Sequence, residues 1–124
     1  MTDEDMREPT FLVLAALADG PRHGYGVIQE VETISKGRVR LRAGTLYAAL
    51  DRLTADGLVR REREEVVAGR LRRYYELTDE GAVALAAQAD RLRANAEEAS
   101  RRLLTRTRSV TPGRAGTALA GGAA

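Results

Sequence analysis

The spacing of apolar residues changes several times along this chain, and each change predicts a new element. Residues 9–18 form a dense apolar stretch that begins with a proline and stops at an Asp-Gly-Pro sequence. A proline start and a Gly-Pro stop are typical of a buried helix. Gly24 and Gly26 would set the start of a second helix and allow a neighbour to approach closely. This short helix, over residues 25–34, is predicted by aliphatic side chains at helical spacing: Ile28, Val31 and Ile34.

The period changes again around a third helix. Residues 38–42 alternate arginine with valine and leucine, which fits a brief strand or an extended linker. Leu46, Leu50 and Leu53 then lie four and three positions apart. They mark the buried face of a helix that ends near Gly57. Another face of this helix carries Thr45, Ala48 and Arg52, with Tyr47 and Asp51 at its flank.

A basic hairpin is predicted directly after this helix. Two charged segments flank Val67-Ala68-Gly69, and the second of them alternates with a period of two. Glycine between such flanks indicates a β-hairpin of the longer-loop kind, in which Gly69 serves mainly the turn. The tip of this hairpin is basic through Arg70, Arg72 and Arg73.

A heptad seam follows the hairpin. Small or apolar residues recur at spacings of 4, 3, 4, 3 and 4, at Leu85, Ala89, Leu92, Ala96, Ala99 and Leu103. A helix over residues 79–104 would be roughly 39 Å long, more than a small domain covers. We therefore expect the seam to be a dimer interface; the alternative is that it packs back on the first helix. The segment from residue 105 to 124 lacks periodicity and predicts a disordered tail.

Charge is distributed unevenly, although the net charge is only +2. Residues 1–35 hold two basic and seven acidic side chains, a sum of −5. Residues 36–73 hold eleven and five, a sum of +6, and residues 74–124 hold seven and six, a sum of +1. A positive middle segment is typical of a face that binds phosphate. The alternative is a solvated surface of arginine and glutamate.

The composition argues against an enzyme. The chain has 124 residues, of which 44% are hydrophobic. This is enough to form one hydrophobic core but not a second. It has no cysteine and a single histidine, His23, so we expect no metal, no cofactor and no catalytic triad. His23 lies in a turn sequence and is interpreted as a surface or helix-capping residue. We expect a cytoplasmic protein, because no apolar run approaches the roughly 20 residues of a membrane span and the acidic start differs from a signal peptide.

A helix followed by an arginine-tipped hairpin predicts a winged helix-turn-helix DNA-binding domain, mainly α with a small β-hairpin. We expect this domain in residues 1–77, a C-terminal dimerisation helix in residues 78–104 and a tail in residues 105–124. The third helix of such a domain enters the major groove of double-stranded DNA, and the wing contacts the backbone or the neighbouring minor groove. The alternative is a winged helix that binds proteins and reads no DNA.

Two sets of residues are the candidate DNA contacts. Arg52 would pair with a guanine, which is worth about 1–3 kcal/mol of discrimination, or instead with Asp51, Asp56 or a phosphate. Tyr47 would donate its hydroxyl to a phosphate or close the helix packing. The set on the third helix is Arg42, Gly44, Thr45, Tyr47, Ala48, Asp51 and Arg52, and the set on the wing is Gly69, Arg70, Arg72 and Arg73.

The chain contains, in this order, the four segments PTFLVLAALADGPRHGYGVIQEV, GTLYAALDRL, DGLV and RRYYELTDEG. They resemble the PadR family of bacterial transcriptional regulators, which shows these segments in the same order. The resemblance covers roughly residues 9–104, and the combination of HGYG, GTLY and YYxLTxxG is specific. It implies a homodimeric winged helix-turn-helix protein that dimerises through its C-terminal helix. Such proteins are usually repressors of inverted-repeat operators, often with ATGT and ACAT half-sites.

The chain departs from the family pattern before its third helix. Family members often have Ser-Pro-Gly-Thr where this chain has Arg42-Ala43-Gly44-Thr45, and a proline is common at Ala48. Arg42 would add a cation near the DNA backbone. The single C-terminal helix resembles the smaller PadR subfamily, of which some members stack flat aromatic drugs on tryptophan. This chain has no tryptophan, which argues against that mode of binding. The sequence neither requires nor excludes a small-molecule effector that occupies the dimer crevice in another way.

Overall fold

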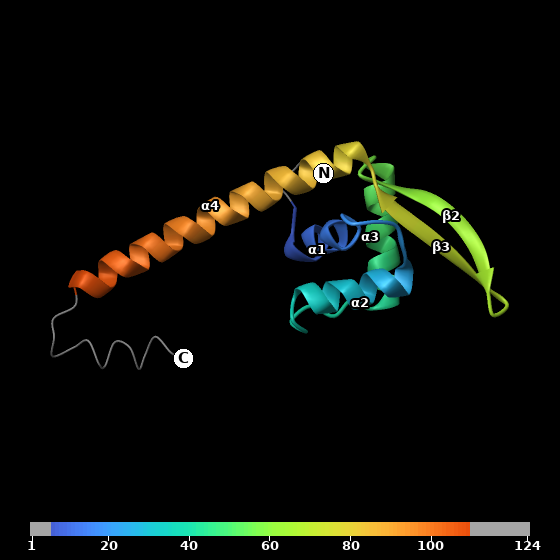
Figure 1. Ribbon diagram of the computed structural model, residues 1–124, viewed down its shortest axis with the longest axis horizontal. Coiled ribbons are helices and arrows are strands. Elements are labelled where there is room, and N and C mark those ends of the chain that lie inside the picture. Colours follow the sequence, from blue (N-terminus) through green and yellow to red (C-terminus); the bar gives the residue numbers. More distant parts are fainter. Residues whose placement is uncertain (1–5, 110–124) are drawn as a thin grey trace. The chain divides into compact units, whose positions relative to one another are not determined.

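The structure is a computed structural model that describes residues 6–109 (Figure 1). It has the predicted mainly α fold with a small β-hairpin. Within the described residues the elements are α1 (Glu8–Ala16), β1 (Arg22–His23), α2 (Gly24–Ile34), α3 (Ala43–Ala55), β2 (Val59–Val67), β3 (Arg70–Leu77) and α4 (Asp79–Ser109). None of these helices has the length and apolarity that crossing a bilayer requires.

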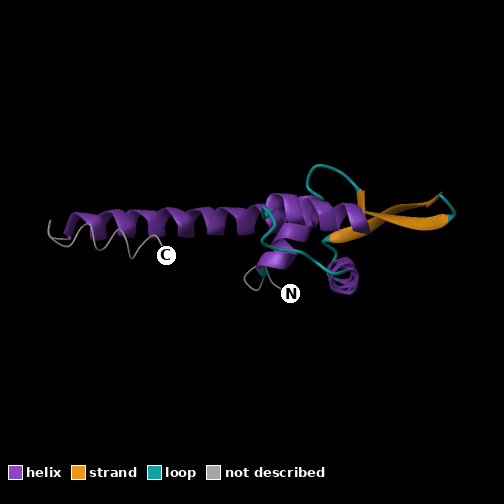
Figure 2. Cartoon of the chain, turned by 90° about the horizontal axis from the view of Figure 1, so that it is seen from below, coloured by secondary structure: helices purple, strands orange, loops and turns teal. Residues whose placement is uncertain are grey.

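The chain divides into two units after Ala89, inside helix α4. The first unit contains helices α1 to α3, the sheet and the start of α4. The described part of the second unit is the remainder of α4, which continues as regular helix to Ser109 (Figure 2). Leu85 packs against the core of the first unit. This unit therefore extends beyond residue 77, the domain boundary that was predicted from the sequence.

The buried core of the first unit is aliphatic apart from Met6 and Tyr75. Tyr75 of β3 is only 2% exposed. The same core cluster contains buried side chains from three helices and a strand, among them Leu12, Val13 and Leu14 of α1, Val27 and Val31 of α2, Leu46, Leu50 and Leu53 of α3, and Val59 of β2. The leucines of α3 are those whose spacing predicted its buried face.

The sheet has three antiparallel strands in the order β1-β3-β2. Strand β1 was not predicted: it pairs Arg22 with Tyr75 and His23 with Tyr74. It is two residues long, too short for any periodic signal in the sequence. The register of β2 against β3 shifts between Arg61 and Arg63, so the residue between them forms a β-bulge.

The hairpin turn is tighter than predicted. Val67 pairs with Arg70, so only Ala68 and Gly69 form the loop. Both have positive φ, 52° and 78°, as a two-residue type I′ turn requires. The expectation of a longer loop was wrong because alanine at the first turn position gives no sign of positive φ.

Two further boundaries differ from the sequence predictions, and one predicted pair of alternatives is decided. Helix α1 ends at Ala16, two residues early. Residues 38–42 form an extended linker without strand pairing, the second of the two alternatives. Helix α4 continues to Ser109, so residues 105–109 do not belong to the tail predicted there. The rest of that predicted tail, residues 110–124, lies outside the described residues.

The base of the hairpin is tied to the start of α4 by Thr78. Its hydroxyl donates to the carbonyl of Gly57 at 2.7 Å and accepts from the amide of Gly81 at 3.0 Å. A Cβ at Gly81 would overlap with the carbonyl oxygen of Leu58 and lie 3.0 Å from its carbon. The absence of a side chain at residue 81 thus allows the first turn of α4 to lie against the chain between α3 and β2.

Candidate nucleic-acid interface

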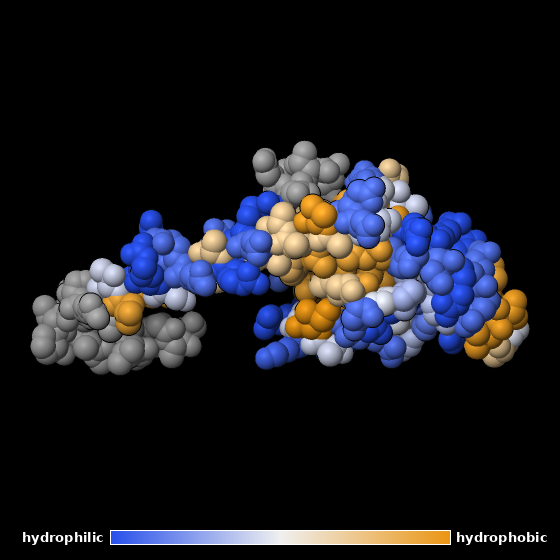
Figure 3. Space-filling view, turned by 45° about the horizontal axis from the view of Figure 1, so that its top comes forward, coloured by the Kyte–Doolittle hydropathy of each residue, from blue (hydrophilic) through white to orange (hydrophobic). Residues whose placement is uncertain are grey.

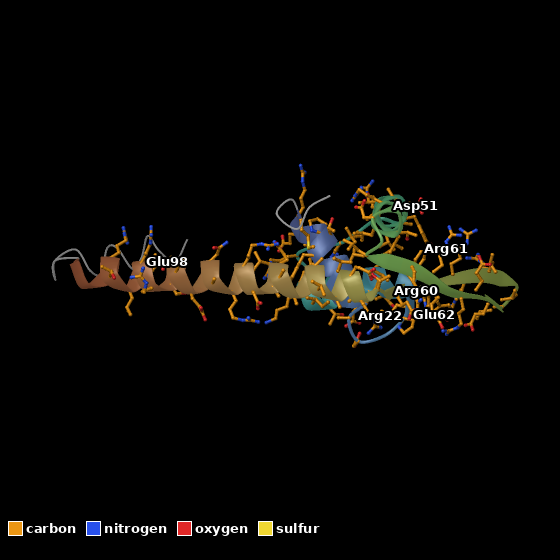
Figure 4. All side chains as sticks on the ribbon, turned by 90° about the horizontal axis from the view of Figure 1, so that it is seen from above. Arg22, Asp51, Arg60, Arg61, Glu62 and Glu98 are labelled. Atoms are coloured by element: carbon orange, nitrogen blue, oxygen red, sulfur yellow. The ribbon has the colours of Figure 1, made fainter. Side chains whose placement is uncertain are left out.

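Helix α3 presents one face to solvent, opposite the leucines that it buries. With about 100° per residue, the centre of this face falls on Gly44, Ala48, Asp51 and Ala55. All seven residues predicted on this helix and at its start are exposed. The centre is therefore made of small side chains and one carboxylate, Asp51, which the sequence had placed at the flank (Figure 4). Such a surface lets the backbone of the helix approach a partner closely.

Thr45 and Arg52 lie on the side of α3 that faces α1. Together with Ala48 they line a cleft of about 390 Å³ that Pro9 and Thr10 of α1 complete. Arg52 forms no ion pair within residues 6–109, so its predicted alternative pairing with Asp51 or Asp56 is absent there. Its guanidinium is available to a ligand.

Tyr47 lies on the opposite side of α3, against the start of α2. A Cβ built on Gly24 would overlap with the Tyr47 hydroxyl and lie 2.7 Å from ring atom Cζ. The close approach predicted for the glycines of this segment is confirmed at Gly24, whereas a Cβ on Gly26 would have only ordinary contacts of 3.6 Å and more. Tyr47 still exposes 42% of its surface, so the side chain packs and remains accessible at once.

His23 caps helix α2, as one of its two interpretations predicted. Its Nδ1 accepts a hydrogen bond from the amide of Gly26 at 3.3 Å, which places the ring proton on Nε2. The ring also meets Tyr74 edge-on, with 5.5 Å between centroids. Burial, and then the charge of Arg72, lowers the pKa of His23 below 6.5, although Glu65 opposes the shift. The cap is thus neutral at neutral pH.

A cleft of about 560 Å³ lies between the start of α2, helix α3 and the wing. Its walls combine tyrosines from the helices with cations from β3. The lining residues are His23, Gly24, Tyr25, Tyr47, Arg70, Leu71, Arg72 and Arg73. The cleft thus brings the three predicted wing arginines together with one predicted residue of α3, Tyr47.

The three wing arginines differ in their partners. Arg73 pairs with Glu64 across the hairpin at 3.0 Å. Arg70 and Arg72 are exposed and form no ion pair with any residue that the structure describes. Two guanidinium groups at the cleft are therefore uncompensated, which favours an anionic partner.

Arg61 is a further cation that the sequence analysis did not single out. It is exposed at the base of the hairpin and has no ion pair in the described part of the chain (Figure 4). Its neighbours are engaged: Arg60 pairs with Glu76 at 2.6 Å, and Arg63 lies 4.0 Å above the ring of Tyr74. Only the strand register decides which of these arginines is free, so sequence alone could not select it.

The predicted seam on α4 changes its exposure along the helix. Leu85 and Ala89 are half-buried, whereas Leu92 is 43% and Leu103 62% exposed. Ala96 and Ala99 are exposed as well.

Residues 6–109 contain no cluster of potential metal ligands.

The chain matches known proteins over the part that carries this interface. The sequence profile of the transcriptional regulator PadR-like family matches residues 13–87. The transcriptional regulator Rv3488 of Mycobacterium tuberculosis is 44% identical over 73 residues, which are 59% of this chain and 64% of that protein. The chain spans only 14% and 64% of the two curated relatives that it matches.

Solved structures share the fold. A PadR-like transcription factor from Bacteroides fragilis superimposes with a TM-score of 0.63 at 27% identity, over 75% of this chain and 87% of that one. PadR of Bacillus subtilis, in complex with operator DNA, gives a TM-score of 0.58 at 22% identity, over 65% of this chain and 46% of that one. The second likeness is one of fold alone.

Proposed function

The chain belongs to the PadR-like family of transcriptional regulators, and from that premise we propose that it is a homodimeric repressor that binds a near-palindromic DNA site. The observation that carries the proposal is the cleft between α3 and the wing. There the uncompensated cations Arg70 and Arg72 stand beside an exposed helix face. Double-stranded DNA is the partner that combines a groove for the helix with phosphates for the cations.

The α3 face and the wing have different roles in this proposal. Helix α3 enters the major groove, where its small central residues allow close approach and Asp51 accepts a hydrogen bond from a cytosine amino group. Arg52 contacts a guanine or a phosphate from the flank. The wing arginines, with Arg42 and Tyr47, bind phosphates and set the register of the protein on the duplex.

Dimerisation is proposed through the seam on α4. A pair of such helices would place the two α3 helices in successive major grooves, roughly 34–36 Å apart. In this arrangement residues 1–77 bind DNA and residues 78–104 dimerise. A small-molecule effector between the paired helices would act by changing the separation of the α3 helices. Such a regulator works in the cytoplasm, beside the chromosome.

Equilibrium titration tests the proposal. A duplex selected by the protein from a random pool is compared with a scrambled duplex at about 50 mM and about 200 mM salt. Arg70→Gln and Arg72→Gln should weaken binding to both duplexes and lower the salt slope by about one unit each. Arg73→Gln, whose guanidinium is paired with Glu64, is the matched control with a smaller effect. Equal, weak binding to both duplexes would instead indicate a winged helix that binds a protein.

A further inference from the structure

The cleft between α2, α3 and the wing has walls that contact with DNA phosphates does not explain. Arg70 and Arg72 would bind phosphate, but Tyr25 and Leu71 line the same cleft. Tyr25 is 64% exposed and Leu71 is 56% exposed. Figure 3 shows apolar surface at the end of the hairpin, which carries Leu71, set apart from the core by hydrophilic surface. An aromatic ring and an aliphatic side chain beside two cations indicate a partner with an anionic and an apolar part.

The cleft opens where strand β1 ends. Strand β1 pairs with β3 only at Tyr75 and Tyr74. Residues 70–73 of β3 lie beyond this point, towards the turn, and pair with β2 alone among the described elements. Because β1 continues directly into α2, the other edge of these residues is left open towards the start of that helix. The resulting volume of about 560 Å³ lies within the roughly 300–1,000 Å³ that is typical of small-molecule sites.

The polar side chains of the cleft are all able to donate hydrogen bonds. Among the described residues that line it, none carries a carboxylate. His23 accepts at Nδ1 from the amide of Gly26, so its Nε2 carries a proton. This N–H and the hydroxyls of Tyr25 and Tyr47 have no acceptor within residues 6–109. Donors without acceptors, beside two uncompensated guanidinium groups, favour a ligand group with several acceptor oxygens.

The spacing of the two uncompensated arginines selects the anion. Arg70 and Arg72 are two positions apart on β3, so their side chains leave the same face of the strand about 7 Å apart. Both guanidinium groups can therefore reach one anion. A phosphate monoester has three free oxygens and a charge of about −1.5 to −2 at pH 7, whereas each phosphodiester of DNA has a single charge. The arginine pair matches a monoester better than it matches one phosphate of the DNA backbone.

The apolar side chains select the rest of the ligand. Tyrosine rings stack on planar rings, and Leu71 adds an aliphatic surface to the same cleft. A nucleoside monophosphate joins a planar base to a phosphate monoester. We propose that the cleft binds a free nucleoside monophosphate, with its phosphate at Arg70 and Arg72 and its base at Tyr25, and that the bound nucleotide displaces DNA.

The displacement of DNA follows from shared residues. Arg70 and Arg72 cannot hold the nucleotide and the DNA backbone at the same time, so the two ligands compete. This part of the inference rests on the proposed function, whereas the binding of the nucleotide does not. The site is separate from the crevice between paired α4 helices.

Calorimetric titration of the full chain without DNA tests nucleotide binding. The probes are adenosine 5′-monophosphate, ribose 5-phosphate, which lacks the base, and the dinucleotide ApA, whose single phosphodiester represents the DNA backbone. The monophosphate should bind about tenfold more tightly than either of the other two. Equal affinity for ApA would mean that the cleft is a DNA phosphate site only, and this result would overturn the proposal, as would the absence of binding.

Variants locate the nucleotide. Arg70→Gln and Arg72→Gln should each weaken the binding of adenosine 5′-monophosphate about tenfold. Tyr25→Leu should weaken it by a similar factor and leave the binding of ribose 5-phosphate unchanged. Arg61→Gln, which removes an uncompensated arginine outside the cleft, is the matched control and should bind like the wild type. An equal loss in this control would indicate attraction by net charge alone and would contradict the site.

Competition with DNA tests the displacement. On a duplex that the wild type selects from a random pool, adenosine 5′-monophosphate should release the protein at the concentrations at which it fills the cleft, and ApA should not. Tyr25→Leu should bind the duplex like the wild type and need about tenfold more nucleotide for release. Unchanged release in this variant would place the nucleotide elsewhere and overturn the proposal. If the nucleotide binds as expected but the protein selects no duplex, the proposed function fails while the nucleotide site stands.

Discussion

The hydroxyl of Tyr47 on α3 fills the space that a side chain at residue 24 of α2 would occupy. A Cβ built on Gly24 would lie 2.7 Å from Cζ of Tyr47 and still closer to its hydroxyl. The glycine therefore sets how closely α2 and α3 approach, and it directs Tyr47 into the cleft beside the wing. Packing and exposure of this tyrosine are consequences of the same contact.

Gly24→Ala should destabilise the fold by about 1–3 kcal/mol, because the methyl group forces Tyr47 or helix α2 to move. Thermal unfolding measures the change. Gly26→Ala in the same helix is the control, since its Cβ would have only ordinary contacts of 3.6 Å and more. That variant should be neutral or stabilised by up to about 1 kcal/mol. Equal effects of the two substitutions would mean that Tyr47 does not fix the spacing of the helices.

Gly81→Ala should be destabilising by about 1–3 kcal/mol, because its Cβ would overlap with the backbone carbonyl of Leu58. Backbone yields less readily than a side-chain end. Gly44→Ala serves as the comparison: it is also a helical glycine, but no atom lies within 4 Å of its Cβ position. In urea unfolding, the free energy of unfolding of Gly81→Ala should be lower than that of the wild type, and that of Gly44→Ala should be equal to it or higher. The reverse order would refute the close contact between α4 and Leu58.

Ala68→Asn should stabilise the hairpin by about 1 kcal/mol. Ala68 has a φ of 52°, a region that costs L-residues roughly 1–2 kcal/mol and that asparagine tolerates best after glycine. The melting temperature reports the gain. Ala55→Asn, in the last turn of α3, is the control and should not stabilise the protein. A loss of stability in the first variant would argue for a longer loop.

The cap on α2 should make stability depend on pH. Because the folded state lowers the pKa of His23 below 6.5, the unfolded chain binds more protons between the two pKa values. The stabilisation is present in full above pH 6.5 and is lost as the pH falls through the folded-state pKa. His23→Asn keeps a side chain that caps a helix but does not titrate. Urea unfolding at about pH 7.5 and about pH 5.5 should show a larger loss for the wild type; equal losses would exclude His23 as the source.

Sequence periodicity predicted the elements that bury a regular face. The leucines of α3 and the alternating residues of β3 carry such a signal, and both elements lie where it indicated. Strand β1 has no periodicity of its own, because it exists through the pairing of Arg22 and His23 with distant residues. The two-residue turn was missed since Ala68 adopts a conformation that alanine disfavours.

The candidate interface was predictable as a set of residues but not as an arrangement. The positive segment and the exposed α3 face were visible in the sequence. Which arginines are free depends on cross-strand partners such as Glu64 for Arg73 and Glu76 for Arg60. The role of Tyr47 likewise depended on a contact with residue 24, far away in the sequence.

The measurement that tests the central proposal most directly is the stoichiometry and affinity of the complex with a selected duplex. The protein is sedimented with a duplex that contains the intact site and, separately, with a duplex in which one half-site is scrambled. A homodimeric regulator should bind the intact site as two chains per duplex. On the duplex with one scrambled half-site it should lose about a hundredfold in affinity, which corresponds to about 2.8 kcal/mol of binding free energy. A single chain bound with equal affinity to both duplexes would contradict the account.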